Sequence, residues 1–173
     1  MKKQFLTCLF LLVFLGTQAQ TKEETVAYIN KLVSDAKPPK KSEGNWSYTL
    51  LEQTFLSNSF TCKWYKTHDY TDRITDTKKT DFLTSIINYK PVNYKYLIDS
   101  FKVEKWDESY TSLILRFSVE VVAVDENSEK ITYPSPNKNI QIIIPTDKVN
   151  NAKRALLHLK ELVTKEKDLF DNK

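Results

Sequence analysis

The chain has 173 residues, with 26 Lys or Arg against 22 Asp or Glu and a formal net charge of +4 at pH 7. This near balance provides no concentrated basic surface, which argues against nucleic-acid binding. Only two glycines are present, Gly16 and Gly44. Loops that hold nucleotide phosphates need several glycines, so nucleotide-binding loops and the Gly-x-Ser-x-Gly elbow of serine hydrolases are excluded.

Cysteine and histidine are too sparse for the usual metal and nucleophile sites. Cys8 lies near the N-terminus and Cys62 is the only other cysteine, so a structural zinc site with several cysteine ligands is excluded. The two histidines, His68 and His158, lie far apart with no paired spacing. We therefore predict no cofactor, no metal site and no catalytic residues that the sequence can name.

The N-terminal segment has the three parts of a secretory signal. Met1-Lys2-Lys3 is basic, Phe5–Leu15 is apolar apart from one threonine, and Gly16–Gln20 supplies small and polar residues for cleavage. The apolar run is shorter than the roughly 20 residues that span a bilayer. We predict a signal peptide over 1–20, a single domain over 21–173 with no transmembrane segment, and export to the periplasm or the exterior of a bacterial cell.

Helices are predicted at both ends of the mature chain. Thr21-Lys22-Glu23-Glu24 reads as a capping box, and the apolar residues that follow recur at helical spacing. A helix over 21–36 should end before Pro38-Pro39, because proline disfavours helical backbone in the preceding residue. After Pro145, apolar residues at three- and four-residue steps predict a long helix over 147–169, capped by Thr146 or Asp147.

Between the helices, residues 46–145 show the period of β-strands. Apolar residues alternate with polar ones over Phe60–Tyr65 and over Leu115–Ala123, where Leu115, Phe117, Val119, Val121 and Ala123 share a face. This alternation predicts burial of Cys62 between Phe60 and Trp64; an exposed Cys62 would instead be able to link two chains. Further candidate strands are Trp46–Phe55, Tyr70–Thr75, Asp81–Asn88, Leu97–Trp106 and Asn139–Ile144.

These elements define an α+β fold. It has an N-terminal helix, an antiparallel barrel or sandwich of six to eight strands, and a long C-terminal helix packed on it.

Two segments support a family resemblance, Glu24–Asn30 near the start and Ala152–Leu159 near the end. They resemble small secreted bacterial proteins of unknown function, and Lys167–Phe170 fits the same resemblance. The element order is similar to a pleckstrin-homology-like barrel, in which a C-terminal helix closes one end. The resemblance implies no catalytic residues, and fold alone does not imply phosphoinositide binding.

Three small groups of residues are candidates for a site. Tyr89, Tyr94 and Tyr96 interleave with lysine and form a possible ligand-contact surface, although such rings commonly pack on a sheet instead. Adjacent His68 and Asp69 would point to opposite faces of a strand and so would not form an acid–base pair. Calcium prefers several oxygen ligands, but ordinary solvated turns and strand ends are the favoured interpretation of the acidic cluster Asp69, Asp72, Asp76 and Asp81.

The absence of catalytic motifs favours an exported, non-enzymatic binding or structural module, whose partner is an unidentified protein or a small amphipathic ligand. A second hypothesis is a carrier of a small amphipathic or lipid-like ligand between the sheet and the C-terminal helix. A third is a cell-envelope hydrolase, which would need two carboxylates roughly 5–9.5 Å apart across a cleft.

Overall fold

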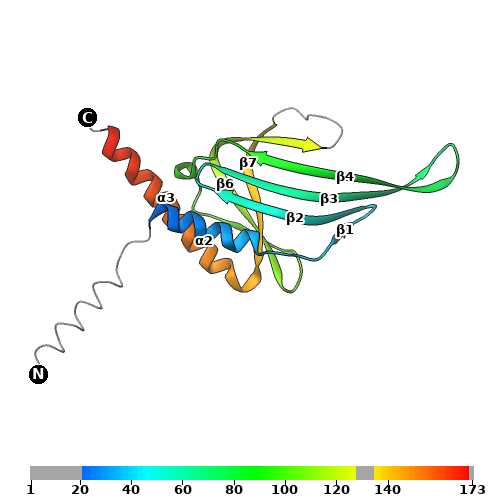
Figure 1. Ribbon diagram of the computed structural model, residues 1–173, viewed down its shortest axis with the longest axis horizontal. Coiled ribbons are helices and arrows are strands. Elements are labelled where there is room, and N and C mark those ends of the chain that lie inside the picture. Colours follow the sequence, from blue (N-terminus) through cyan, green and yellow to red (C-terminus); the bar gives the residue numbers. More distant parts are fainter. Residues whose placement is uncertain (1–20, 128–134, 172–173) are drawn as a thin grey trace, which may run out of the picture.

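The computed structural model describes residues 21–127 and 135–171, so the predicted signal segment 1–20 lies outside the described residues. The predicted α+β fold is confirmed, with a helix at each end of the described chain and an antiparallel sheet between them (Figure 1). The elements are α2 (Lys22–Ser34), β1 (Lys41–Glu43), β2 (Trp46–Leu56), β3 (Ser59–Asp72), β4 (Thr77–Tyr89), η1 (Tyr94–Tyr96), β5 (Lys102–Lys105), β6 (Tyr110–Asn127), β7 (Ser135–Pro145), η2 (Thr146–Lys148) and α3 (Val149–Asp171).

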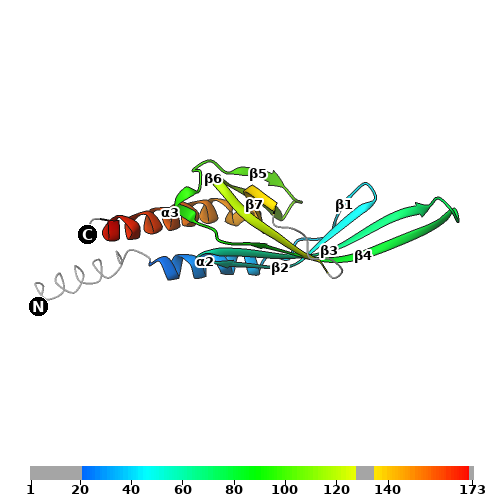
Figure 2. The ribbon, with the colours of Figure 1, turned by 90° about the horizontal axis from the view of Figure 1, so that it is seen from above.

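The seven strands form one bent sheet with the order β1-β2-β3-β4-β6-β5, and β7 pairs with β6 as well. Strand β6 is long enough to pair with two strands along one edge. Its first part pairs with β5 and its last part with β4, while β7 follows the other edge. As a result, β6 and β7 cross the layer of β2, β3 and β4 steeply (Figures 1 and 2).

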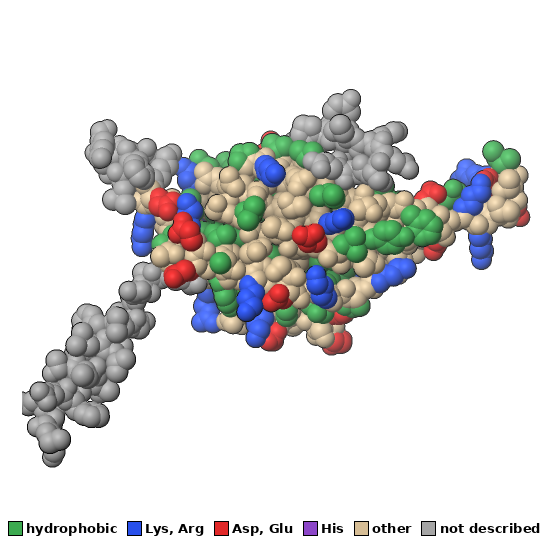
Figure 3. Space-filling view, viewed as in Figure 1, with side chains coloured by type: hydrophobic (Ala, Val, Ile, Leu, Met, Phe, Trp, Pro, Cys, Tyr) green, Lys and Arg blue, Asp and Glu red, His purple; other side chains and the backbone are tan. Residues whose placement is uncertain are grey.

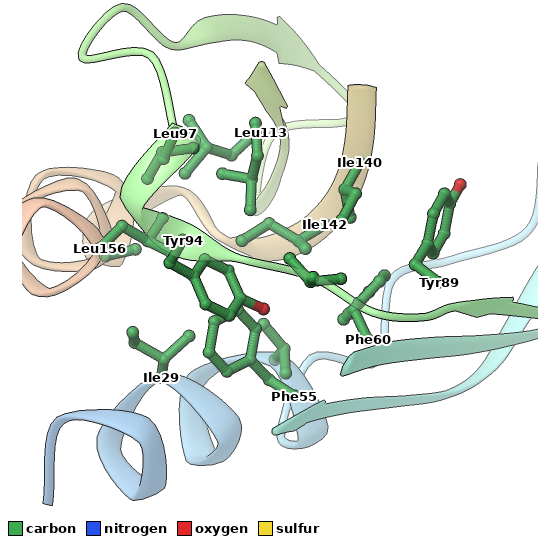
Figure 4. Close-up of a cluster of buried hydrophobic side chains, with 14 of the residues drawn as sticks. Ile29, Phe55, Phe60, Tyr89, Tyr94, Leu97, Leu113, Ile140, Ile142 and Leu156 are labelled. Atoms are coloured by element: carbon green, nitrogen blue, oxygen red, sulfur yellow. The ribbon is translucent and has the colours of Figure 1, made fainter. Parts of the chain in front are cut away.

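The hydrophobic core lies on the side of β7 that faces the helices. Figure 4 shows side chains from α2, α3, η1 and the strands meeting there. Alternation along β6 and β7 turns one face to this core, where Leu113, Leu115, Ile140 and Ile142 are fully buried. They pack with buried residues of the other elements, which include Ile29, Phe55, Phe60, Tyr94, Leu156 and Leu159.

Helix α2 begins with the predicted capping box. The Thr21 hydroxyl accepts a hydrogen bond from the Glu24 N–H at 3.2 Å, and the Glu24 carboxylate accepts one from the Thr21 N–H at 2.9 Å. The helix ends at Ser34, before the two prolines as predicted. It covers the edge of β2 that β1 leaves unpaired, where the Asn30 amide oxygen accepts a hydrogen bond from the Phe55 N–H at 2.8 Å.

The buried side chain of Gln53 joins β2 to both α2 and β7. Its amide nitrogen donates to the carbonyls of Val33 at 3.0 Å and Ile143 at 2.8 Å, and its amide oxygen accepts from the Ile143 N–H at 2.8 Å. The amide thus occupies the position of a peptide group beside β7. Backbone groups at the edge of β7 that have no strand partner are satisfied by a side chain instead.

A β-bulge puts Gln53 into this position. The register between β2 and β3 shifts between Leu50 and Glu52, so Leu51 is extra and 41% exposed. Upstream of the bulge, even-numbered residues such as Tyr48 and Leu50 face inward, whereas Gln53 and Phe55 face inward beyond it. A strand without the bulge would turn the charged Glu52 inward instead.

Several sequence-based strand predictions are corrected. Tyr70–Thr75 is not a separate strand, because β3 runs on to Asp72 and a turn follows. Only Lys102–Lys105 of the predicted strand Leu97–Trp106 is a named strand, and Leu97 makes an isolated bridge to Phe117. The short strand β1 lies before residues 46–145, outside the region that the sequence predicted to hold the strands. Val119 is 39% exposed rather than inward, because β6 and β7 lose their register between Arg116 and Val121.

Substituting Gln53 by leucine should destabilise the fold strongly. The N–H and C=O of Ile143 would lose their partners in a buried environment, at a cost of about 2–4 kcal/mol in the free energy of unfolding. Urea denaturation measures this loss. The control is Gln141→Leu, the same change at an exposed position of β7, which removes one hydrogen bond to the Ser112 hydroxyl and should cost about 1 kcal/mol or less. Equal effects of the two changes would contradict the assigned role of Gln53.

The Tyr94 hydroxyl contributes nothing favourable to the core. It is buried and, among the described residues, has no hydrogen-bond partner; burial also raises the pKa of this hydroxyl. Tyr94→Phe should therefore leave the free energy of unfolding unchanged or raise it by up to about 1 kcal/mol. Tyr94→Ala should lower it by about 3–5 kcal/mol. A clear loss of stability in Tyr94→Phe would show that the hydroxyl is hydrogen-bonded in solution.

Candidate functional site

A pocket lies on the side of β7 away from the core, and two tryptophan rings and buried core residues line it. Its volume is about 350 Å³, within the range of small-molecule sites. The inner face of β3 and β4 forms its floor. Residues of β1, β2, β5 and β7 and the residue after β5 complete the lining, which consists of Lys41, Glu43, Tyr48, Cys62, Trp64, Lys66, Ile87, Tyr89, Glu104, Trp106 and Gln141.

Trp106 closes one side of the pocket by linking the two ends of the sheet. Its indole N–H donates to the Pro39 carbonyl at 3.1 Å, and the Lys41 ammonium lies 5.1 Å from the centre of its ring. The loop after β5 is thereby joined to the segment that leads into β1. The rings of Trp106 and Trp64 lie 5.8 Å apart at 31°. The pair forms a half-buried aromatic wall.

The floor of the pocket is continuous with the core. Cys62 is buried as predicted, and its Sγ accepts a hydrogen bond from the Trp64 indole N–H at 3.3 Å. Tyr89 is 7% exposed, and its ring contacts Phe60 of the core with centroids 6.0 Å apart. Because the floor is built from core residues, its shape does not depend on loops.

The charges around the pocket are mostly paired within their own strands. Lys41 lies 2.8 Å from Glu43 in β1, and Lys102 lies 2.6 Å from Glu104 in β5. Lys66 differs, because no acidic side chain lies within ion-pair distance of it among residues 21–127 and 135–171 with described side chains. Its neighbours by register are Tyr48 on β2 and Leu83 on β4.

Beyond the pocket, the same face of the sheet continues as a row of stacked rings. The rings run from Tyr48 to Trp46, His68 and Tyr70, with centroid distances of 6.5, 4.2 and 5.5 Å and interplanar angles of 22°, 12° and 18°. These rings are nearly parallel, and the closest contact is between Trp46 and His68. Trp46 and His68 are opposite each other on β2 and β3, and such cross-strand aromatic pairs stabilise a sheet. The other two contacts join residues two apart on one strand.

Past Trp46 the strands β3 and β4 continue alone as a projecting hairpin, residues 69–80, which we call the arm (Figure 1). Ile74 at its tip is 96% exposed. Phe82 near its base is 65% exposed and stacks on Tyr65, and both rings lie on the face of the sheet opposite the pocket. Figure 3 shows apolar side chains on the sheet at the base of the arm and again at its end. The arm is a second candidate surface, and its tip is not covered by any other described residue.

The turn of the arm is organised by Asp72. Its carboxylate accepts hydrogen bonds from the N–H groups of Ile74 and Thr75 and pairs with the Lys79 ammonium. The hydrogen bond from Lys79, followed by the one from Ile74, lowers the pKa of this carboxyl. Asp76 closes the turn in the left-handed conformation, at φ 51°, which aspartate tolerates better than most residues.

The three tyrosines of the predicted ligand-contact surface do not lie together. Tyr94 is buried in the core, and Figure 4 shows its ring well apart from that of Tyr89. Tyr89 lines the floor of the pocket, and half-buried Tyr96 lies near the Lys95 ammonium, 4.6 Å from its ring centre. Residues 94–96 form a 3-10 turn, which removes the shared face that an extended segment would give. The sequence analysis thus placed one residue, Tyr89, at the pocket.

The polar candidates are distributed over separate local interactions. Asp69 accepts a hydrogen bond from the Thr80 hydroxyl at 2.7 Å, while His68 stacks on Trp46, so the two point to opposite faces as predicted. Asp81 accepts from the Tyr70 hydroxyl at 3.4 Å. Half-exposed His158 on α3 lies 3.9 Å from Glu161. No group of three potential metal ligands occurs among the described residues.

Neither Trp64 nor Trp106 was singled out by the sequence as a site residue. The available signal was that Trp64 alternates with Cys62 on a strand, which predicts an inward ring. The contact between Trp106 and Trp64 depends on the crossing of β5 over the sheet, which no local pattern encodes.

No family model matches the sequence, and no curated protein or solved structure is significantly similar to it. Within the described chain, no helix is both long and apolar enough to cross a bilayer.

The Asp72 carboxyl should titrate below the ordinary aspartate value of 3.8, because its ion pair and hydrogen bonds favour the charged form. The turn is then intact above pH 3.8 and loosens only as the pH falls through the lowered pKa. A carbon NMR titration of the carboxyl measures this midpoint. Lys79→Met should raise it toward 3.8. A midpoint at or above 3.8 in the unchanged chain would contradict the assigned interactions.

Proposed function

We propose that this chain is an exported, non-enzymatic binding module whose ligand site is the pocket between Trp64 and Trp106. One observation carries the proposal: a pocket of about 350 Å³ with a floor of core residues and a half-buried aromatic wall. Half-exposed tryptophan rings beside a few charged groups are typical of sites for amphipathic molecules.

The position of the pocket changes the carrier hypothesis. A ligand between the sheet and α3 would have to displace buried side chains, since Tyr94, Leu113, Leu156 and Leu159 occupy that space. The pocket on the other side of β7 supports a small amphipathic ligand better. We therefore keep the amphipathic ligand of this hypothesis and assign it to the pocket.

The hydrolase hypothesis receives less support from the site. Two carboxylates, Glu43 and Glu104, line the pocket. A glycosidase needs one carboxyl group kept protonated and one ionised, which requires two different environments. Here both side chains are well exposed, by 59% and 43%, and each pairs with a lysine two residues away on its own strand. This similarity favours binding over catalysis.

Native mass spectra of the protein isolated from its exported fraction, beside a denatured control, test the proposal. We expect an additional mass that disappears on denaturation and is reduced in Trp106→Ala, which removes half of the aromatic wall. Phe82→Ala is the matched control, because it removes an exposed ring from the other face of the sheet and should retain the mass.

A single clean mass in the unchanged chain would disfavour a tightly held ligand and redirect the search to protein partners. Turnover of cell-envelope material by the purified protein, abolished in Glu43→Gln or Glu104→Gln, would overturn the non-enzymatic part of the proposal. A mass equal to that of residues 21–173 would also verify the predicted cleavage after residue 20.

A further inference from the structure

The charge arrangement of the pocket narrows the class of ligand, on the basis of the proposed function. Four charged side chains line the pocket. Lys41 and Glu43 form one ion pair at 2.8 Å, and Glu104 forms another with Lys102 at 2.6 Å. Lys66 is the remaining charge, and it has no acidic partner within ion-pair distance among the residues whose side chains are described.

The surroundings of Lys66 show why its ammonium has no partner. On its own strand, the residues facing the same side are Trp64 and His68, and the residues opposite it are Tyr48 and Leu83. None of these carries a negative charge. The nearest acidic residue on β4 is Asp81, which lies closer to the arm, opposite His68. Its carboxylate accepts a hydrogen bond from the Tyr70 hydroxyl.

Lys66 is half-buried, with aromatic residues beside it and opposite it, and an ammonium without an acidic partner attracts a negative group. The apolar part of the pocket is next to it, since Trp64 is two residues away on the same face and contacts Trp106. A ligand that satisfies both features has an anionic group and an apolar body.

We infer that the pocket binds a small organic anion, a carboxylate or sulfonate attached to an apolar ring or chain. The anionic group pairs with Lys66, and the apolar body packs against Trp64 and Trp106. The two tryptophan rings are 5.8 Å apart, too close for a third ring to enter between them, so the ligand lies across the aromatic wall.

Three probes of similar shape and different charge test this inference: 1-naphthaleneacetate, 1-naphthaleneacetamide and 1-naphthalenemethylamine, which are anionic, neutral and cationic. Binding is measured by calorimetry and by amide NMR shifts on the isotope-labelled protein. In the unchanged chain we expect the anion to bind about tenfold more tightly than the amide, and the amine to bind most weakly. Added salt should weaken binding of the anion only.

Lys66→Gln should weaken binding of the anion about tenfold and leave the affinity of the amide unchanged, because only the anion pairs with the ammonium. Lys63→Gln is the matched control. Lys63 lies on the same strand and faces the opposite side of the sheet, so its substitution should leave all three affinities unchanged. The shifted amides should lie in β3, β4 and the segment around Trp106.

The two proposals fail in different ways. Equal affinities of the anion and the amide, or an anion that binds Lys66→Gln normally, would overturn the inference about charge and leave a neutral binding pocket. No shift of the pocket amides by any probe at millimolar concentration, together with a clean native mass, would overturn the pocket as a ligand site. Shifts confined to α3 or the arm would place the site elsewhere and overturn both.

Discussion

The amide of Gln53 connects the parts of this fold that its backbone leaves unconnected. The sheet is open, and β7 stands with one edge toward the inner face of β2. A single side chain satisfies the Ile143 N–H and C=O there and also reaches the last turn of α2. Because β7 is fixed in this way, it separates two environments. The core lies on one side, and the pocket with its aromatic wall lies on the other.

The two sides of β7 differ because side chains alternate between the two faces of each strand, and because β6 and β7 cross the layer of β2, β3 and β4. On the core side, β6 and β7 present apolar residues, aliphatic except for Phe117, and the helices complete the burial. On the other side, Gln141 of β7 and Glu104 of β5 face the same floor from which Trp64 and Tyr89 project. The proposed site is therefore the part of the concave surface that no helix covers. Its rigidity follows from sharing its floor with the core.

Much of the fold could be predicted from local patterns, and the site could not. The capping box, the prolines and the three- and four-residue apolar steps defined both helices within a few residues. The alternation around Cys62 predicted its burial. The bulge at Leu51 breaks the alternation in β2, so no pattern indicated that Gln53 turns inward. Lys41, Trp64 and Trp106 meet only through long-range pairing, whereas Tyr94, chosen for its local pattern, belongs to the core.

The stacked rings at the base of the arm make its length independent of the core. The hairpin is supported where its pairing with β2 ends by the rings of Tyr48, Trp46, His68 and Tyr70. The residues beyond these rings pair only with one another. Inserting or deleting two residues in each strand preserves the face of every side chain and changes the reach by roughly 7 Å. Related chains could therefore differ in how far this hairpin extends while keeping the same body and the same pocket.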